Sequence, residues 1–156
     1  MSVQLRPLRE DEFGAWSEDS RAWYALDLVE HAGMPQEAAE RKAVADMAAA
    51  FKDGFATEGN ALFVIEEDGG AVGSLWFAPR EQYGEKQAFL YAIKLDEAYR
   101  GRGLGRQAME LLEVEVKARG FDRVMLNVFG RNETARALYR KLGYGEAAVY
   151  MAKELA

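Results

Sequence analysis

The sequence predicts an α+β fold, with residues 1–156 forming a single domain in which helices pack against a mixed central β-sheet. Strand and helix signals follow one another in the order β-α-α-β-β-β-α-β-α-β. Two of the strands are joined by a short hairpin signal, Asp68-Gly69-Gly70. A chain of 156 residues with 49% hydrophobic composition is also long enough to bury a core of its own.

The first half of the chain is expected to form a strand, two helices and two further strands. These elements are predicted at residues 3–6, 11–29, 35–51, 61–65 and 71–77. Pro7 ends the first strand because proline removes a backbone donor. Pro35 suits the first turn of the second helix, where the missing N–H would have no partner in any case.

The second half is expected to form a strand, a helix, a strand, a helix and a last strand. These elements are predicted at residues 89–95, 104–118, 123–128, 132–142 and 146–152. Residues 89–95 are apolar and aromatic enough for a buried strand. From Leu104 to Ala118 the apolar positions follow helical spacing, and Gly120 supplies a stop.

Three glycines alternate with arginines at residues 100–106 (RGRGLGR), between an expected strand and an expected helix. This glycine–arginine loop leads into a helix N-terminus, where backbone N–H groups are free and the helix dipole is positive. Glycine lets an anion approach the backbone closely, and arginine adds charge-assisted hydrogen bonds. A simple turn with solvated arginines would need only one glycine. The pattern therefore predicts a binding site for a pyrophosphate.

Two common nucleotide-binding motifs fit the loop less well. A P-loop requires Gly-Lys-Ser/Thr, which does not follow here. Residues 103–108 match the dinucleotide pattern G-x-G-x-x-A, but residues 96–102 separate this match from the strand. Asn127 also stands where an acidic residue would hold the ribose. A dinucleotide-binding oxidoreductase is thus an alternative, which a comparison of coenzyme A and NAD binding would separate.

Residues 93–105 closely resemble motif A of the GNAT superfamily of N-acetyltransferases, whose core Gln/Arg-x-x-Gly-x-Gly/Ala is matched by Arg100, Gly103 and Gly105. Residues 126–144 resemble motif B, with its core Asn-x-x-Ala-x-x-Leu-Tyr-x-x-x-Gly-aromatic. The resemblance implies the GNAT fold, in which the strands at 89–95 and 123–128 splay apart and acetyl-CoA enters the gap. It implies an acetyl-CoA-dependent enzyme that transfers an acetyl group directly to a primary amine of a small molecule or peptide. A non-catalytic, acyl-CoA-binding GNAT-like module is the alternative.

The resemblance also implies which residues contact acetyl-CoA. The backbone of the strand at 93–95 pairs with the pantetheine arm like an added strand, and one of its N–H groups holds the thioester oxygen. The pyrophosphate lies on the backbone N–H groups of the glycine–arginine loop. The implied cofactor-binding residues are Ile93, Lys94, Leu95, Arg100, Gly101, Arg102, Gly103, Leu104, Gly105, Arg106, Asn132 and Tyr139. Asn132 also suits the N-cap of the helix that follows it.

Tyr139 is the residue that the resemblance assigns to acid catalysis, where it protonates the departing thiolate. Its spacing alone favours a core tyrosine whose hydroxyl is hydrogen-bonded. The general base is open, and the candidates are Glu30, His31, Tyr91 and Glu81. Asn127 stands where some protein N-terminal acetyltransferases place a glutamate base, and an amide cannot accept the proton. This departure argues against a ribosomal-protein type of substrate.

The net charge of −6 is divided unevenly along the chain. Residues 1–79 hold six Lys and Arg against fifteen Asp and Glu, whereas residues 80–156 hold fourteen against eleven. The basic half contains the predicted pyrophosphate site. The acidic half favours a cationic acceptor and disfavours nucleic acid. The alternative is that its acidic side chains only keep the exposed helix surfaces hydrated.

The composition excludes several other classes of protein. The chain has no cysteine, which excludes a cysteine nucleophile, a disulfide framework and a cysteine-based metal site, and no metal is expected. No apolar run has the length of a membrane span or the form of a signal peptide. We therefore expect a cytoplasmic enzyme without a membrane partner, and a homodimer is left open.

Overall fold

The computed structural model describes residues 2–156 and contains a mixed five-stranded sheet. Its strands are β1 (Val3–Pro7), β2 (Ala61–Glu67), β3 (Gly70–Gln82), β4 (Glu85–Leu95) and β5 (Val124–Leu126). Its helices are α1 (Glu10–Ala32), α2 (Gln36–Ala50), α3 (Leu104–Ala118) and α4 (Glu133–Lys141). It also contains two short 3-10 helices, η1 (Gly54–Ala56) and η2 (Glu97–Tyr99). The strand order in space follows the chain, β1-β2-β3-β4-β5. The first four strands pair antiparallel and β5 pairs parallel with β4, so the predicted mixed sheet is confirmed.

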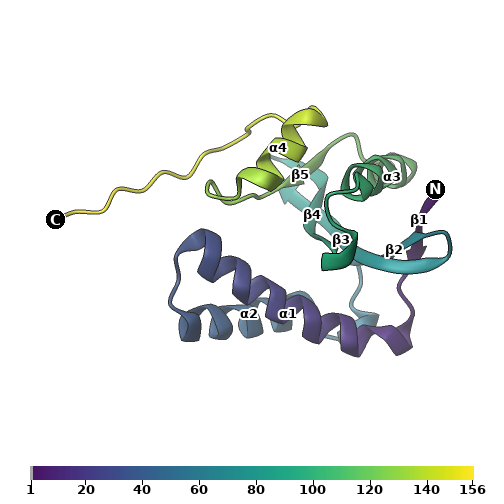
Figure 1. The fold of residues 1–156 in the computed structure, drawn as a ribbon, viewed down its shortest axis with the longest axis horizontal. Helices are drawn as coiled ribbons and strands as arrows, with labels where there is room; N and C mark the ends of the chain where they lie inside the picture. The colour runs from purple at the N-terminus through teal and green to yellow at the C-terminus, as the bar shows by residue number, and fades with distance from the viewer. Residues whose placement is uncertain (1) are drawn as a thin grey trace.

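Helices cover both faces of the sheet (Figure 1). On one face, α3 packs an apolar stripe against β2, β3 and β4, consisting of Leu104, Ala108, Met109, Leu112 and Val116. On the other face, α1 and α2 enclose a cluster built around Trp16, Met47 and Trp76. The indole N–H groups of the two tryptophans donate to Ser74 and Asn60, so both rings are core residues with satisfied donors.

The hairpin of β3 and β4 is longer than the sequence predicts. The expected strands ended at residue 77 and began at residue 89, whereas pairing continues to Gln82 and Glu85 at the Tyr83-Gly84 turn. The added residues are largely polar, and cross-strand backbone hydrogen bonds rather than apolar burial hold them. A pattern search for apolar residues cannot find such an extension.

The expected strand at residues 146–152 is wrong for the isolated chain. Residues 145–156, here called the C-terminal tail, are exposed and form neither helix nor strand. Figure 1 shows the tail leaving α4 and extending away from the rest of the molecule. A strand exists only when its backbone groups pair with a neighbour, and within residues 2–156 no strand pairs with the tail.

A β-bulge in β4 marks the place where the sheet opens. Trp76 of β3 pairs with Ala92, and Phe77 pairs with Leu90, so Tyr91 is the extra residue between them. Pairing between β4 and β5 ends at the same point, at Leu90, although β4 continues to Leu95. The two strands therefore splay apart as predicted. Residues 91–95 of β4 are not paired with β5, so the backbone groups on that side of β4 are open.

Candidate functional site

The glycine–arginine loop presents its backbone to open space at the start of α3. Gly103 is the N-cap of α3 with φ of 78°, and Gly101 has φ of 75°, a left-handed conformation that L side chains rarely adopt. A Cβ added at either position would meet nothing within 4 Å. No side chain caps the first turn of α3, so its N–H groups are available to a bound anion. The loop fits a pyrophosphate.

The arginines of the loop are held by neighbouring groups. Arg100 Nε donates to the carbonyl of Leu95 at 3.1 Å. The Arg102 guanidinium contacts the Glu67 carboxylate at 3.1 Å, and Arg106 pairs with Glu110 one turn further along α3. An anion that bound these guanidinium groups would compete with the carboxylates for them. We therefore assign the larger share of anion binding to the backbone and not to the arginines.

Three predicted parts of the site meet at the first turn of α3. A Cβ placed on Gly105 would lie 3.6 Å from Leu138 of α4 and 3.7 Å from Leu95 of β4. Ile93, Leu95 and Tyr139 all pack against the apolar cluster on which α3 lies. Lys94 differs from its neighbours, since its Nζ lies 3.3 Å from Asp19 of α1 and thus on the other face of the sheet. The open end of β4, the loop and α4 accordingly enclose one region.

Tyr139 lies at this meeting point with an unusual hydroxyl group. Its pKa is raised to about 12, chiefly by burial and further by the Asp27 carboxylate. Within the residues that the structure describes, the hydroxyl has no hydrogen-bond partner, whereas the hydroxyl of Tyr144 donates to Glu113 at 2.8 Å. The packing of Tyr139 against the core cluster agrees with a core role, and its role as the acid stays a prediction. The raised pKa keeps its hydroxyl protonated at neutral pH.

Asn132 is the N-cap of α4, as its type and position predict. Its side-chain oxygen accepts a hydrogen bond from the backbone N–H of Ala135 at 3.2 Å. This contact fixes the start of α4 and with it the direction in which Tyr139 leaves the helix.

An acidic–histidine pair lies at the end of α1. Nδ1 of His31 is 2.6 Å from Oδ1 of Asp27, and both side chains are partly buried. The Asp27 charge contributes, after burial, to the raised pKa of Tyr139. A Cβ added to Gly33, directly after α1, would lie 3.5 Å from the Arg131 guanidinium. The i,i+4 spacing of Asp27 and His31 is the signal in the sequence that could have predicted this pair.

The other candidate bases lie in different surroundings. Tyr91 stacks on Trp76 with ring centroids 4.7 Å apart and lines a hollow with Asn60 and Lys86. Glu81 pairs across the β3–β4 hairpin with Lys86, toward the tip of that hairpin. Glu30 is exposed on α1, next to the pair but not part of it.

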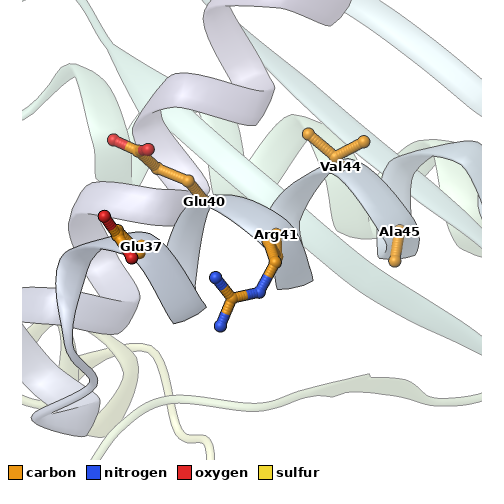
Figure 2. A pocket seen from close by; sticks show the side chains of 5 residues that line it. All are labelled: Glu37, Glu40, Arg41, Val44 and Ala45. Carbon is orange, nitrogen blue, oxygen red and sulfur yellow. The ribbon is translucent and has the colours of Figure 1, made fainter.

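A second hollow lies on α2, outside this region. Figure 2 shows its five lining residues, all from that one helix: Glu37, Glu40, Arg41, Val44 and Ala45. It contains none of the predicted site residues, so we do not place the site there.

Residues 2–156 contain no group of three or more Asp, Glu and His side chains that could hold a metal ion. None of the helices there combines the length and apolar character that crossing a membrane requires.

Comparisons with known proteins agree on one family. The sequence model of the acetyltransferase (GNAT) family matches residues 9–144. The chain is 29% identical to YycN of Bacillus subtilis, named an uncharacterized N-acetyltransferase, over 99% of this chain and 100% of that protein. It is 30% identical to YdgE of the same organism, which carries the same description, over 99% of both chains.

Solved structures share the fold. The crystal structure of YycN superposes with a TM-score of 0.91, at 28% identity and over 99% of both chains. An aminoglycoside N-acetyltransferase solved in complex with CoA superposes with a TM-score of 0.66, at 18% identity, over 99% of this chain and 95% of that one.

Proposed function

The chain belongs to the acetyltransferase (GNAT) family, and we propose that it transfers an acetyl group from acetyl-CoA directly to a primary amine of a small molecule or peptide. One observation carries this proposal: the open end of β4, the first turn of α3 after the glycine–arginine loop, and α4 with Tyr139 lie next to one another. The CoA complex of a protein with the same fold supports the choice of donor. Residues 1–156 act as one domain in this proposal, and a cytoplasmic location is still an expectation from the sequence.

Acetyl-CoA supplies the acetyl thioester, and this chain binds and orients it. The N–H groups at the start of α3, from Gly101 to Arg106, hold the pyrophosphate. The β4 backbone at Ile93–Leu95 pairs with the pantetheine arm, since β5 leaves that edge free. A strand N–H stabilises the negative charge that develops on the thioester oxygen during attack.

Tyr139 donates a proton to the departing sulfur. Burial keeps its hydroxyl protonated in the neutral range, and no competing acceptor holds the proton. A free thiol with an ordinary pKa of about 8.5 needs only modest help to leave. Loss of Tyr139 therefore slows turnover without abolishing it.

We infer that His31 accepts the proton of the attacking amine. An aliphatic amine has a pKa near 10.4 and is mostly protonated at neutral pH, so a base assists its attack. Asp27 holds Nδ1 of His31, which leaves Nε2 for the amine or an intervening water. In this proposal the acceptor amine binds beside the end of α1.

The acceptor in this proposal is a cation, because the first 79 residues carry nine more acidic than basic side chains. Asp27, Glu30 and the α1 surface would attract it.

The direct experiment incubates the protein with acetyl-CoA and a panel of primary amines and follows the release of free thiol. We expect amine-dependent thiol release together with a mass increase of one acetyl group on the amine. Tight acetyl-CoA binding without turnover on any amine would favour the non-catalytic module instead. Binding of NAD in preference to coenzyme A would favour the oxidoreductase.

The role of His31 is tested with His31→Gln on two acceptors of similar shape and different amine pKa. We expect a fall in kcat/KM of about 10²-fold for the strongly basic amine, on the usual scale of general-base catalysis. The fall should be much smaller for the weakly basic amine, which is already neutral. Added imidazole should restore part of the loss. Equal losses on both amines without rescue would show a structural role only.

A further inference from the structure

The β-bulge in β4 turns the Tyr91 side chain into a hollow. Side chains alternate between the two faces of a strand, but the extra residue of a bulge places two consecutive side chains on one face. Ala92 packs against the cluster that contains Trp76, and the Tyr91 ring stacks on Trp76 with planes 20° apart. Both side chains therefore lie on the face of the sheet that α1 and α2 cover.

This ring hollow, as we call it, has a volume of about 450 Å³. It lies beside the part of β3 that continues beyond the last residue paired with β2. Its walls are largely apolar and include Trp76, Tyr91, Ala78 and Pro79. A cavity of roughly 150 Å³ can hold a benzene molecule, so the ring hollow has ample room for a six-membered ring.

The polar groups of the ring hollow are already engaged or cancel one another. Asn60 accepts a hydrogen bond from the indole N–H of Trp76 at 2.8 Å and donates one to the Ala50 carbonyl at 3.0 Å. The charged lining residues, Glu58 and Lys86, are exposed and of opposite sign. The ring hollow therefore offers a ligand apolar surface in preference to a charge partner.

An arginine already occupies one end of the aromatic row that lines this face. The row runs from Trp76 through Tyr91 to Phe89, whose ring centroid lies 4.8 Å from that of Tyr91. The Arg80 guanidinium lies 4.5 Å from the centroid of the Phe89 ring. Its positive charge disfavours a second cation beside it. The Tyr91 side, which is 42% exposed, suits an uncharged ring instead.

Tyr91 also lies at the end of the path proposed for acetyl-CoA. The glycine–arginine loop adjoins the Leu95 end of β4, because Arg100 donates to the Leu95 carbonyl and a Cβ on Gly105 would lie 3.7 Å from Leu95. A pantetheine arm that leaves the loop along β4 therefore runs from Leu95 toward Ile93. Its thioester end then approaches Tyr91, the first residue of β4 beyond the pairing with β5.

We propose that the ring hollow binds a flat, uncharged ring of the acceptor, so that the substrate class is an arylalkylamine. This inference rests on the proposed acetyl transfer and names the acceptor of that reaction. The ring stacks on Tyr91, and a short linker carries the amine from there to the thioester. Tyr91 is then a specificity-determining residue.

The first experiment compares phenylethylamine with cyclohexylethylamine as acceptors. The two amines share the linker and the reacting group, and only the first has a flat aromatic ring. We expect kcat/KM to be roughly three- to tenfold higher for phenylethylamine, which is the range that one aromatic pair contributes. Equal values in the wild-type protein would overturn the proposal.

Variants assign this preference to Tyr91. Tyr91→Ala should remove most of it, and Tyr91→Phe should keep it because the ring remains. Tyr83→Ala is the matched control, since Tyr83 is 71% exposed at the tip of the same hairpin and does not line the ring hollow. A preference that survives Tyr91→Ala would overturn the role of Tyr91.

A binding measurement separates the ring hollow from the proposed function. The assigned indole N–H signal of Trp76 is followed by NMR while phenylethylamine is added to the protein with coenzyme A and no acetyl donor. We expect a saturable shift in the wild type and in Tyr83→Ala, and its loss in Tyr91→Ala. A saturable shift without turnover in the thiol-release assay would keep the ring hollow and refute the proposed function. Turnover of phenylethylamine without this shift would keep the function and overturn the ring hollow.

Discussion

The hydroxyl of Tyr144 donates a 2.8 Å hydrogen bond to the Glu113 carboxylate and so joins the end of α4 to α3. Tyr139, whose ring lies 5.9 Å from that of Tyr144 in an edge-to-face arrangement, has a hydroxyl without such a bond. The two neighbouring tyrosines therefore differ: the Tyr144 hydroxyl links α4 to α3, whereas we propose that the Tyr139 hydroxyl donates a proton in the reaction.

Tyr139→Phe and Tyr144→Phe form a matched pair for this difference. We expect Tyr139→Phe to lower kcat by about 10²-fold at nearly unchanged acetyl-CoA affinity and stability. Tyr144→Phe should instead lose about 1–2 kcal/mol of unfolding free energy, because Glu113 loses its donor. Steady-state kinetics and denaturant unfolding of both variants check this. Wild-type turnover in Tyr139→Phe would leave Tyr139 as a packing residue only.

Gly103→Glu should abolish acetyl-CoA binding while the fold persists. The new side chain would occupy the space in front of the α3 N-terminus and repel the pyrophosphate. Gly120→Glu is the control at the other end of α3, because Gly120 also has positive φ and open space around its Cβ position. Calorimetry should show lost affinity in the first variant and retained affinity in the second. Equal affinities would remove the glycine–arginine loop from the site.

Gly73→Ala should disturb the strand that holds the pantetheine arm. A Cβ at Gly73 would meet the Lys94 carbonyl oxygen of β4 far inside van der Waals contact, so the backbones must separate. We expect a loss of about 1–3 kcal/mol of stability and weaker acetyl-CoA binding. Gly70→Ala in the same strand is the control, since its nearest atom is 3.7 Å away. Thermal unfolding and calorimetry of the two variants would show whether this close approach matters.

The α1 N-terminus should loosen at low pH. Hydrogen bonds from the Arg6 guanidinium, then from the Arg9 backbone, lower the Glu12 pKa from 4.5 to about 2. Because the folded pKa lies below the unfolded one, this stabilisation is present above pH 4.5 and is lost as pH falls through about 2. Glu12→Gln should flatten the pH dependence of stability in that window, and Glu18→Gln on the same helix should not. Unfolding midpoints measured from pH 6 to 2 decide between these outcomes.

The charge on α1 should attract the acceptor in a salt-dependent way. With acetyl-CoA saturating, kcat/KM for a cationic amine should fall as salt increases, because exposed charges are screened. The double variant Asp27→Asn with Glu30→Gln should weaken the dependence of kcat/KM on salt, whatever its effect on the absolute rate. The double variant Glu37→Gln with Glu40→Gln removes the same charge from α2 and should leave that salt dependence unchanged. An acceptor that is anionic or insensitive to salt would refute the idea.

The parts that the sequence predicts well are those that local pattern decides. The α3 stripe, the Asp68-Gly69-Gly70 turn and the loop ahead of α3 follow from periodicity and glycine placement. The i,i+4 spacing of Asp27 and His31 permits their pairing within α1. The burial of the Tyr139 hydroxyl depends instead on how segments distant in the sequence pack together, which no local pattern encodes. In the tail the local pattern misleads, because residues 146–152 have the composition of a strand but no strand pairs with them.

The chain-order arrangement of the sheet has a consequence for synthesis on the ribosome. β1 to β4 are neighbours in sequence order, so their antiparallel sheet can assemble, with α1 and α2 against one face, before residues 96–156 have emerged. The parallel partner β5 and the helix carrying Tyr139 can be added only after α3 has crossed over the sheet. A nascent chain would thus acquire its scaffold early and the helix that carries Tyr139 last. Ribosome-stalled chains ending before residue 120 should then be protease-resistant and inactive.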